Sequence, residues 1–414
     1  MGSAEVVVAV IKRNKSPLTA LSFAALALPG VMVSAADTDK YSVDTLFSRY
    51  SESNNRMKID AYQASAYLPL TDTLNFSVNG VKDIVTGASP VAYYPNAGAA
   101  KMIMSGASIA DVRDSVDISG SYTNSLGQFG VDVGRSSEND YNSSFFNIDS
   151  KFDFNQKNTT LALGYGFASD NVWAIDHCPP HCDGMVGNEG KYRRSGVGGE
   201  KQNHQGLIGI TQLIDKHSLI QANITYSYSG GYLSDPYKAV YAPWVTEPYP
   251  NYANSGYMHD TRPGEKHQIA FLTRYVRHFN DLNSAALHVD YRYYSDTWNI
   301  GAHTFELSWN QPIVYHWSIT PKFRYYSQSS AEFYQPYFNS ERSDGFYSSD
   351  YRLARFGSLS GGVQLEKKFF SKLSVGFAID FYKRDYSYSI NGGAGSPVDN
   401  FTFSILSANI NYKF

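Results

Sequence analysis

Apolar and polar residues alternate with a period of two along most of the chain. In the segment 372–382, for example, Phe377 and Phe381 belong to an apolar row, whereas Ser374 and Asp380 belong to the small and polar row between them. Successive side chains of a β-strand point to opposite faces, so this pattern predicts strands with one apolar and one polar face. We count about sixteen such segments, at 42–51, 57–69, 73–86, 112–125, 128–138, 143–155, 159–170, 203–214, 218–230, 265–279, 282–296, 299–311, 315–328, 351–367, 372–387 and 401–414.

The connections between these segments are mostly short on one side and long on the other. Very long connections lie at 87–111, 171–202 and 231–264. Short turns alternating with long loops are typical of outer-membrane barrels, whereas a soluble sandwich runs to about 100 residues and has no such loop rule. The pattern therefore predicts an all-β fold, a transmembrane antiparallel β-barrel of about sixteen strands with short periplasmic turns and long extracellular loops. We expect the tight turns at 70–72, 126–127, 156–158, 215–217, 280–281, 312–314 and 368–371.

Composition fits a barrel better than a soluble or helical protein. Charged residues make up only 18% of the chain and aromatic residues 15%, against roughly 25% charged residues in soluble domains. The mean hydropathy of −0.35 is too low for a helical membrane protein. Past the N-terminus, no apolar run approaches the ~18 residues that a spanning helix needs. With a net charge of −3, the chain has no basic footprint, so we expect no nucleic-acid partner.

The N-terminal residues have the features of a secretory signal peptide. Lys12 and Arg13 precede an apolar run at 18–28, and a small-residue cleavage site follows that run. We therefore expect residues 1–35 to be a signal peptide. Residues 36–414 are then a single barrel domain located in the bacterial outer membrane.

The last strand ends in an aromatic residue, Phe414, which follows Ile410 and Tyr412 on the same face. This ending resembles the C-terminal strand signal read by the bacterial outer-membrane assembly machinery. Aromatic rings near both ends of other strands would form girdles at the membrane interfaces. We therefore expect two partners, the lipid of the outer membrane and its assembly machinery, the second through the strand that ends at Phe414.

Several sequence motifs occur in the order found in one uncharacterised family. They are SGAS at 105–108, DVR at 111–113, GYLSDPYK at 231–238, RYYSDTW at 292–298 and RYYSQS at 324–329. With these motifs the chain resembles the outer-membrane family of domain of unknown function 3570. The resemblance covers most of the mature chain and implies a barrel, and that family has no assigned activity to transfer.

The only two cysteines, Cys178 and Cys182, alternate with His177 and His181 in the long connection 171–202. Two thiols and two imidazoles suit Cu or Zn. The two cysteines are also close enough in sequence to pair with each other, because thiols oxidise in an exported protein. We favour a local disulfide and keep the metal site as the alternative. No cofactor is expected.

The inner face of the predicted barrel carries charges of both signs on consecutive strands. These charges either select solutes or form a salt-bridge lattice that stiffens the wall. The residues of this lumen charged band are Arg274, Asp290, Arg292, Glu306, Lys322, Arg324, Glu366 and Asp380.

The connection 231–264 is rich in rings and prolines, which favour an ordered loop. It either folds into the lumen as a constriction, or caps the mouth as a ligand or partner surface, or is an incidental surface loop. Its candidate residues are Tyr232, Asp235, Tyr237, Tyr241, Trp244 and Tyr249.

The sequence predicts a pore or transporter for small polar solutes. The alternative is a non-conducting scaffold whose loops or plugged lumen hold a partner protein or a metal ion, with an unidentified periplasmic or surface partner. We name no catalytic residue, because the chain has no G-x-S-x-G elbow and no nucleotide-binding loop. An enzyme is therefore the least favoured reading.

Overall fold

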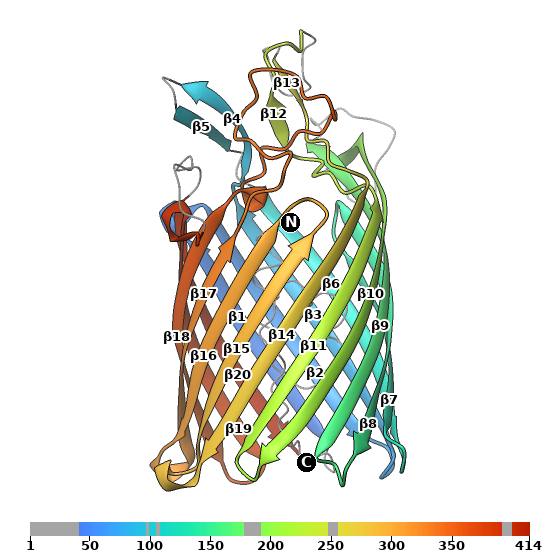
Figure 1. The fold of residues 1–414 in the computed structure, drawn as a ribbon, viewed down its shortest axis with the longest axis vertical. Coiled ribbons are helices and arrows are strands. Elements are labelled where there is room, and N and C mark those ends of the chain that lie inside the picture. Colours follow the sequence, from blue (N-terminus) through green and yellow to red (C-terminus); the bar gives the residue numbers. More distant parts are fainter. Residues whose placement is uncertain (1–40, 97–98, 105–107, 178–191, 247–255, 391–399) are drawn as a thin grey trace.

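The computed structural model describes residues 41–96, 99–104, 108–177, 192–246, 256–390 and 400–414. The expected signal peptide, 1–35, lies outside the described residues. In the described part of the chain, sixteen antiparallel strands close into a single barrel (Figure 1). This confirms the fold class predicted from the period-two pattern.

The barrel strands follow one another around the wall in chain order, and the last pairs with the first. They are β1 (Ser42–Glu52), β2 (Met57–Pro69), β3 (Leu74–Gly87), β6 (Ser108–Thr123), β7 (Gln128–Ser137), β8 (Tyr141–Phe154), β9 (Thr159–His177), β10 (Tyr192–Asp215), β11 (Ser218–Gly231), β14 (Glu265–Phe279), β15 (Ala285–Asp296), β16 (Gly301–Pro312), β17 (Trp317–Gln328), β18 (Phe356–Phe369), β19 (Leu373–Asp385) and β20 (Phe401–Lys413).

Two short hairpins lie outside the barrel sheet. One pairs β4 (Pro90–Asn96) with β5 (Ala99–Met104), and the other pairs β12 (Ala239–Tyr241) with β13 (Tyr257–His259). Both lie beyond the same rim of the barrel, whereas the C-terminus and the short turns lie at the opposite rim (Figure 1). We call these rims the loop end and the turn end. No helix in the described ranges is long and apolar enough to cross a membrane.

The main difference from the expected strands concerns the connection 171–202. β9 continues to His177 and β10 begins at Tyr192, so much of this connection is a strand extension rather than a loop. The pairing of the two strands continues through this extension, from Trp173 opposite Gly198 to His177 opposite Tyr192. The register shifts between Arg194 and Gly198. The period-two pattern is weak in this glycine-rich and charged stretch, which explains why the strands were expected to be shorter.

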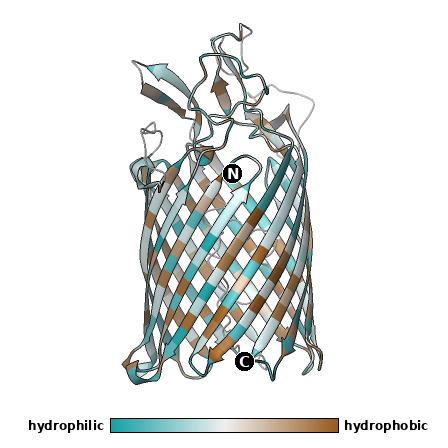
Figure 2. Cartoon of the chain, in the orientation of Figure 1, coloured by the Kyte–Doolittle hydropathy of each residue, from teal (hydrophilic) through white to brown (hydrophobic). Residues whose placement is uncertain are grey.

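The outer face of the barrel is apolar at alternate positions, as Figure 2 shows along the strands. Phe377 and Phe381, for example, are 57% and 59% exposed. Several polar groups on this face are paired across strands, which suits a surface that faces lipid. The pairs are Tyr165–His204, Tyr226–His267, Tyr291–His303, Arg49–Asp60 and Lys82–Asp114.

The inner face is polar along most of its height and has one apolar cluster near the loop end. Tyr50, Ile59, Phe403 and Ile405 are buried there on β1, β2 and β20. Tyr382 of β19 stacks on Phe403 with ring centroids 4.3 Å apart. This cluster packs the inner face where the first and last strands pair.

Candidate functional site

The strand register places four charged residues of the lumen band side by side. Arg274 lies opposite Asp290, Asp290 opposite Glu306, and Glu306 opposite Arg324, on β14, β15, β16 and β17. Arg274 donates from Nε to Asp290 Oδ1 (2.8 Å) and from Nη2 to Asp290 Oδ2 (2.6 Å). A bidentate pair of this kind is among the strongest charged contacts in proteins and fixes both side chains.

A second ion pair of the band spans a whole strand. Lys322 on β17 lies opposite Gly362 on β18, and Gly362 lies opposite Asp380 on β19. Lys322 Nζ reaches Asp380 Oδ1 at 2.7 Å. A β-carbon on Gly362 would lie 1.9 Å from that oxygen, so the pair depends on the missing side chain.

The other four members of the band form no ion pair within the described residues. Glu306 and Arg324 are register partners without a salt bridge, and Glu366 lies nearer the turn end. Arg292 is the most isolated, because its buried Nη2 atom has no hydrogen-bond partner in the described part of the chain. The band therefore contains two ion pairs that can stiffen the wall, and four charged residues that form no ion pair within the described residues.

Two loops at the loop end form a cap, which we define as residues 232–264 and 329–355 as far as they are described. Asp235, from the first loop, receives a hydrogen bond from Arg352 Nη2 of the second (2.5 Å). Arg262, also from the first loop, donates to Asp350 Oδ2 (2.8 Å) and to Asp260 Oδ2 (2.6 Å). Ion pairs thus tie the two loops together.

The charges in this cap network are buried or half-buried, and they are balanced. Asp350 is fully buried between Arg262 and Arg352, and Lys238 contacts the carbonyl oxygen of Pro90 and lies over the ring of Tyr351. Burial alone would raise the pKa of Asp350, but the neighbouring Arg352, Lys238 and Arg262 hold it well below its ordinary value. Asp350 is therefore ionised at any physiological pH.

Apolar packing completes the cap. Val240 and Phe338 are buried against Tyr347, and Trp244 and Met258 pack on the same cluster. The cluster joins β12 and β13 of the first loop to the second loop. It lies at the mouth of the barrel, beyond the rim at the loop end (Figure 1).

The structure places the candidate residues of the connection 231–264 in this cap. Tyr232 follows β11 and donates its backbone N–H to Glu200 (2.8 Å). Tyr241 packs edge-on against Tyr257, and Trp244 packs against Tyr347. Two candidate segments lie outside the described residues: 178–191, with Cys178, His181 and Cys182, and 247–255, with Tyr249. His177 is the last residue of β9.

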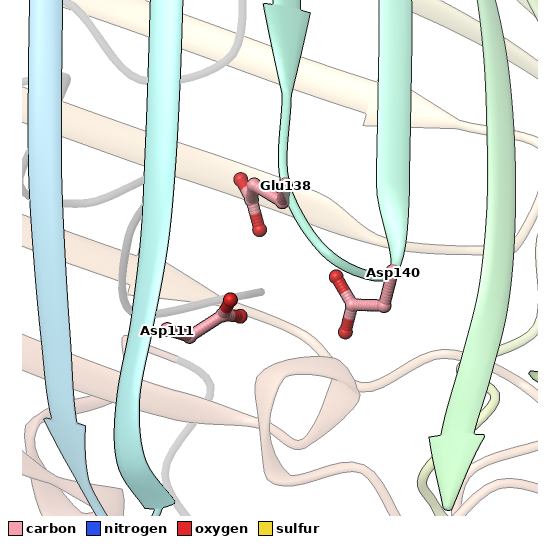
Figure 3. Close-up of side chains that lie close together, drawn as sticks. All are labelled: Asp111, Glu138 and Asp140. Carbon is pink, nitrogen blue, oxygen red and sulfur yellow. The ribbon is translucent and has the colours of Figure 1, made fainter. Parts of the chain in front are cut away.

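Three carboxylates that the sequence did not single out meet beside the cap (Figure 3). Asp111 lies near the start of β6, and Glu138 and Asp140 lie in the turn between β7 and β8. Their oxygens lie within 4.8 Å of one another. Tyr237 of the cap donates to Asp140 Oδ2 (2.7 Å), so the trio adjoins an anchor of the cap on the rim.

Burial raises the pKa of Glu138 to about 7, although Arg113 opposes the shift, and the charges of Asp140 and Asp111 add to it. The sequence signal for this trio was only the spacing of Glu138 and Asp140 in a three-residue turn. Asp111 comes from another hairpin, so the meeting of all three depends on strand register.

The sequence analysis also did not single out the second cap loop, residues 329–355. Its length, from Ser329 to Arg355 between two strands, and its rings Phe333, Phe338 and Tyr347 are visible in the sequence. These residues are as rich in aromatic side chains as the connection that was singled out. No local sequence pattern indicates that the two loops pack against each other.

The family model described as "Protein of unknown function (DUF3570)" matches residues 18–405. No curated protein sequence matches the chain.

Similar solved structures include a "Bacterial polysaccharide outer membrane secretin", at 8% identity and a TM-score of 0.46, with 91% of this chain and 99% of that chain covered. Another is the "CymD monoaromatic hydrocarbon channel", at 10% identity and a TM-score of 0.42, with 91% and 88% covered. A third is a mutant of the ferric enterobactin receptor PfeA from Pseudomonas aeruginosa, at 8% identity and a TM-score of 0.42, with 84% and 53% covered. This chain therefore spans about half the length of that receptor chain.

Proposed function

The chain belongs to the DUF3570 family of proteins of unknown function, and we propose that it is an outer-membrane pore or transporter for small polar solutes whose mouth is closed by the cap. The observation that carries this proposal is the charged inner wall of a closed sixteen-stranded barrel. Sixteen strands enclose more space than wall side chains fill, and charges on an inner face require water.

The cap supports a gated pore rather than a permanently open one. Its two loops are joined by a buried ion pair between Arg262 and Asp350, by a half-buried one between Arg352 and Asp235, and by an apolar cluster. Separating the loops would break these ion pairs and expose the apolar cluster, so the contacts favour the closed cap, and a solute would pass only after the loops separate.

Conductance in planar bilayers tests the proposal. We expect the intact protein to open rarely, and Arg352→Gln to open more often, because Asp235 and Asp350 lose their shared cation. Deletion of residues 238–257 should increase conductance further. Arg342→Gln is the matched control, since among the described residues Arg342 forms an ion pair with the partly exposed Asp344 and donates to the carbonyl oxygen of Glu332, both in its own loop.

Silence of the intact, Arg352→Gln and loop-deleted proteins, all correctly folded, would contradict the pore. The scaffold alternative would then be preferred. One observation favours it: the apolar cluster around Tyr50 and Phe403 occupies the inner face just below the cap. In that case the cap and the long loops would hold an unidentified surface partner, and proteins that co-purify with the folded barrel would differ after the loop deletion.

A further inference from the structure

Arg292 is a half-buried cation on the inner wall, and it forms no ion pair with any of the described residues. It lies on β15 between Leu272 of β14 and Thr304 of β16, so neither register neighbour offers a carboxylate. Its Nη2 atom is buried, and within the described ranges no hydrogen bond reaches it. Leaving a buried guanidinium nitrogen without an acceptor is costly, so such a group is expected to meet an anion.

A second arginine adds to the same charge. Arg324 lies close enough to Arg292 to act on it electrostatically. Its register partner is Glu306, one pair nearer the turn end, and the two form no salt bridge. Glu306, the carboxylate opposite Arg324, therefore forms an ion pair with neither arginine.

The other carboxylates of this region are already engaged. Both oxygens of Asp290 accept hydrogen bonds from Arg274, and Asp380 binds Lys322. Asp296 binds Lys266 (2.9 Å) and accepts from Tyr294 (2.6 Å). Glu306 is thus the one carboxylate of this group that no ion pair engages, and with Arg292 and Arg324 it leaves a local excess of one positive charge among the described residues.

We propose that Arg292 and Arg324 form a binding site for the oxyanion group, phosphate or carboxylate, of a small solute in the lumen. The planar guanidinium donates two parallel hydrogen bonds to such groups, which matches their geometry. Arginines on a pore wall select anions in the same way. This inference rests on the proposed function, because it names the class of solute that the pore would take.

Equilibrium binding to the folded, full-length protein in a chloride-free buffer tests the site without requiring conduction. Calorimetric titration with inorganic phosphate in one arm and acetate in the other should give saturable binding in at least one arm. Arg292→Gln should weaken that binding at least tenfold, and Arg324→Gln should weaken it as well. Should Arg292→Gln fail to fold, Arg324→Gln still carries the test.

Arg135→Gln is the matched control, because Arg135 is exposed on the outer face of β7 and the substitution removes the same charge. Absence of binding in both arms, or equal weakening by Arg135→Gln, would overturn the site. Binding that depends on Arg292 in a protein that never conducts would support the site and reject the pore, so the two proposals can fail separately.

Discussion

Gly362→Ala tests whether the Lys322–Asp380 ion pair requires a residue without a side chain at position 362, which lies between them on β18. The added β-carbon would lie 1.9 Å from Asp380 Oδ1 and 2.7 Å from the carbonyl oxygen of Ile379. The carboxylate could rotate away, but the carbonyl belongs to the backbone of β19 and cannot move without disturbing the ladder. The substitution should therefore break the ion pair and strain the pairing of β18 with β19.

The cost follows from two terms. Overpacking of a well-packed site costs typically 1–3 kcal/mol. The ion pair adds little more, since its side chains are 23% and 12% exposed and lumen water can hydrate them once separated. Against this, replacing glycine by alanine at an unstrained position stabilises by roughly 0.4–1 kcal/mol through the unfolded state. We expect a net loss of about 1–2 kcal/mol.

Gly361→Ala is the matched control one residue away. Its β-carbon would point to the outer face and meet only the carbonyl oxygen of Lys322 at 3.8 Å, an ordinary contact. Urea unfolding of the folded barrels, followed by tryptophan fluorescence, should show a lower midpoint for Gly362→Ala and an unchanged or slightly higher one for Gly361→Ala. Equal midpoints for the two variants would refute the steric argument.

Three further predictions follow from other parts of the molecule. The folded protein should migrate anomalously on a gel until it is boiled, because a closed barrel leaves no strand edge to fray; migration unchanged by boiling would count against it. Mass spectrometry should show the loss of two hydrogens at Cys178 and Cys182 and no bound metal, whereas free thiols with stoichiometric Cu or Zn would reverse that order. Because burial raises the pKa of Glu138 from its ordinary value of 4.5 to about 7, the folded state binds a proton in that range that the unfolded state does not; stability should fall as pH rises from 4.5 to 7. Glu138→Gln should flatten this slope of the urea midpoint, and an unchanged slope would show that another group titrates.

The strands could be predicted because their signal is local. A residue such as Phe377 or Asp380 reports its face through the parity of its position, and the tight turns fix the pairing of neighbours. Parity also placed the lumen charges in rows, and adjacent members such as Arg274 and Asp290 follow from hairpin register. The ion pair between Lys322 and Asp380 spans three strands and requires a glycine on the middle one. The register of neighbouring strands alone therefore does not predict it.

The cap could not be predicted because its contacts are not local. Asp235 and Arg352 are separated by 117 positions in the sequence, and neither loop has a periodic pattern that would specify its partner. The abundance of rings indicated an ordered loop but left open what that loop would pack against. Only the closure of the barrel brings β11 and β18 to the same rim, where the two loops meet.

The cap and the inner wall balance their buried charges differently, and this difference bears on how a solute would pass. In the cap, three carboxylates face three cations, so the closed state needs no added ion. On the wall, Arg292 lacks a carboxylate even while the cap is closed. A bound oxyanion would satisfy that charge without disturbing the cap. The two proposed events are therefore independent in charge: the cap would control access, and Arg292 would contribute selectivity, whichever loop movement opens the mouth. The cap charges are Asp235, Asp260, Asp350, Lys238, Arg262 and Arg352.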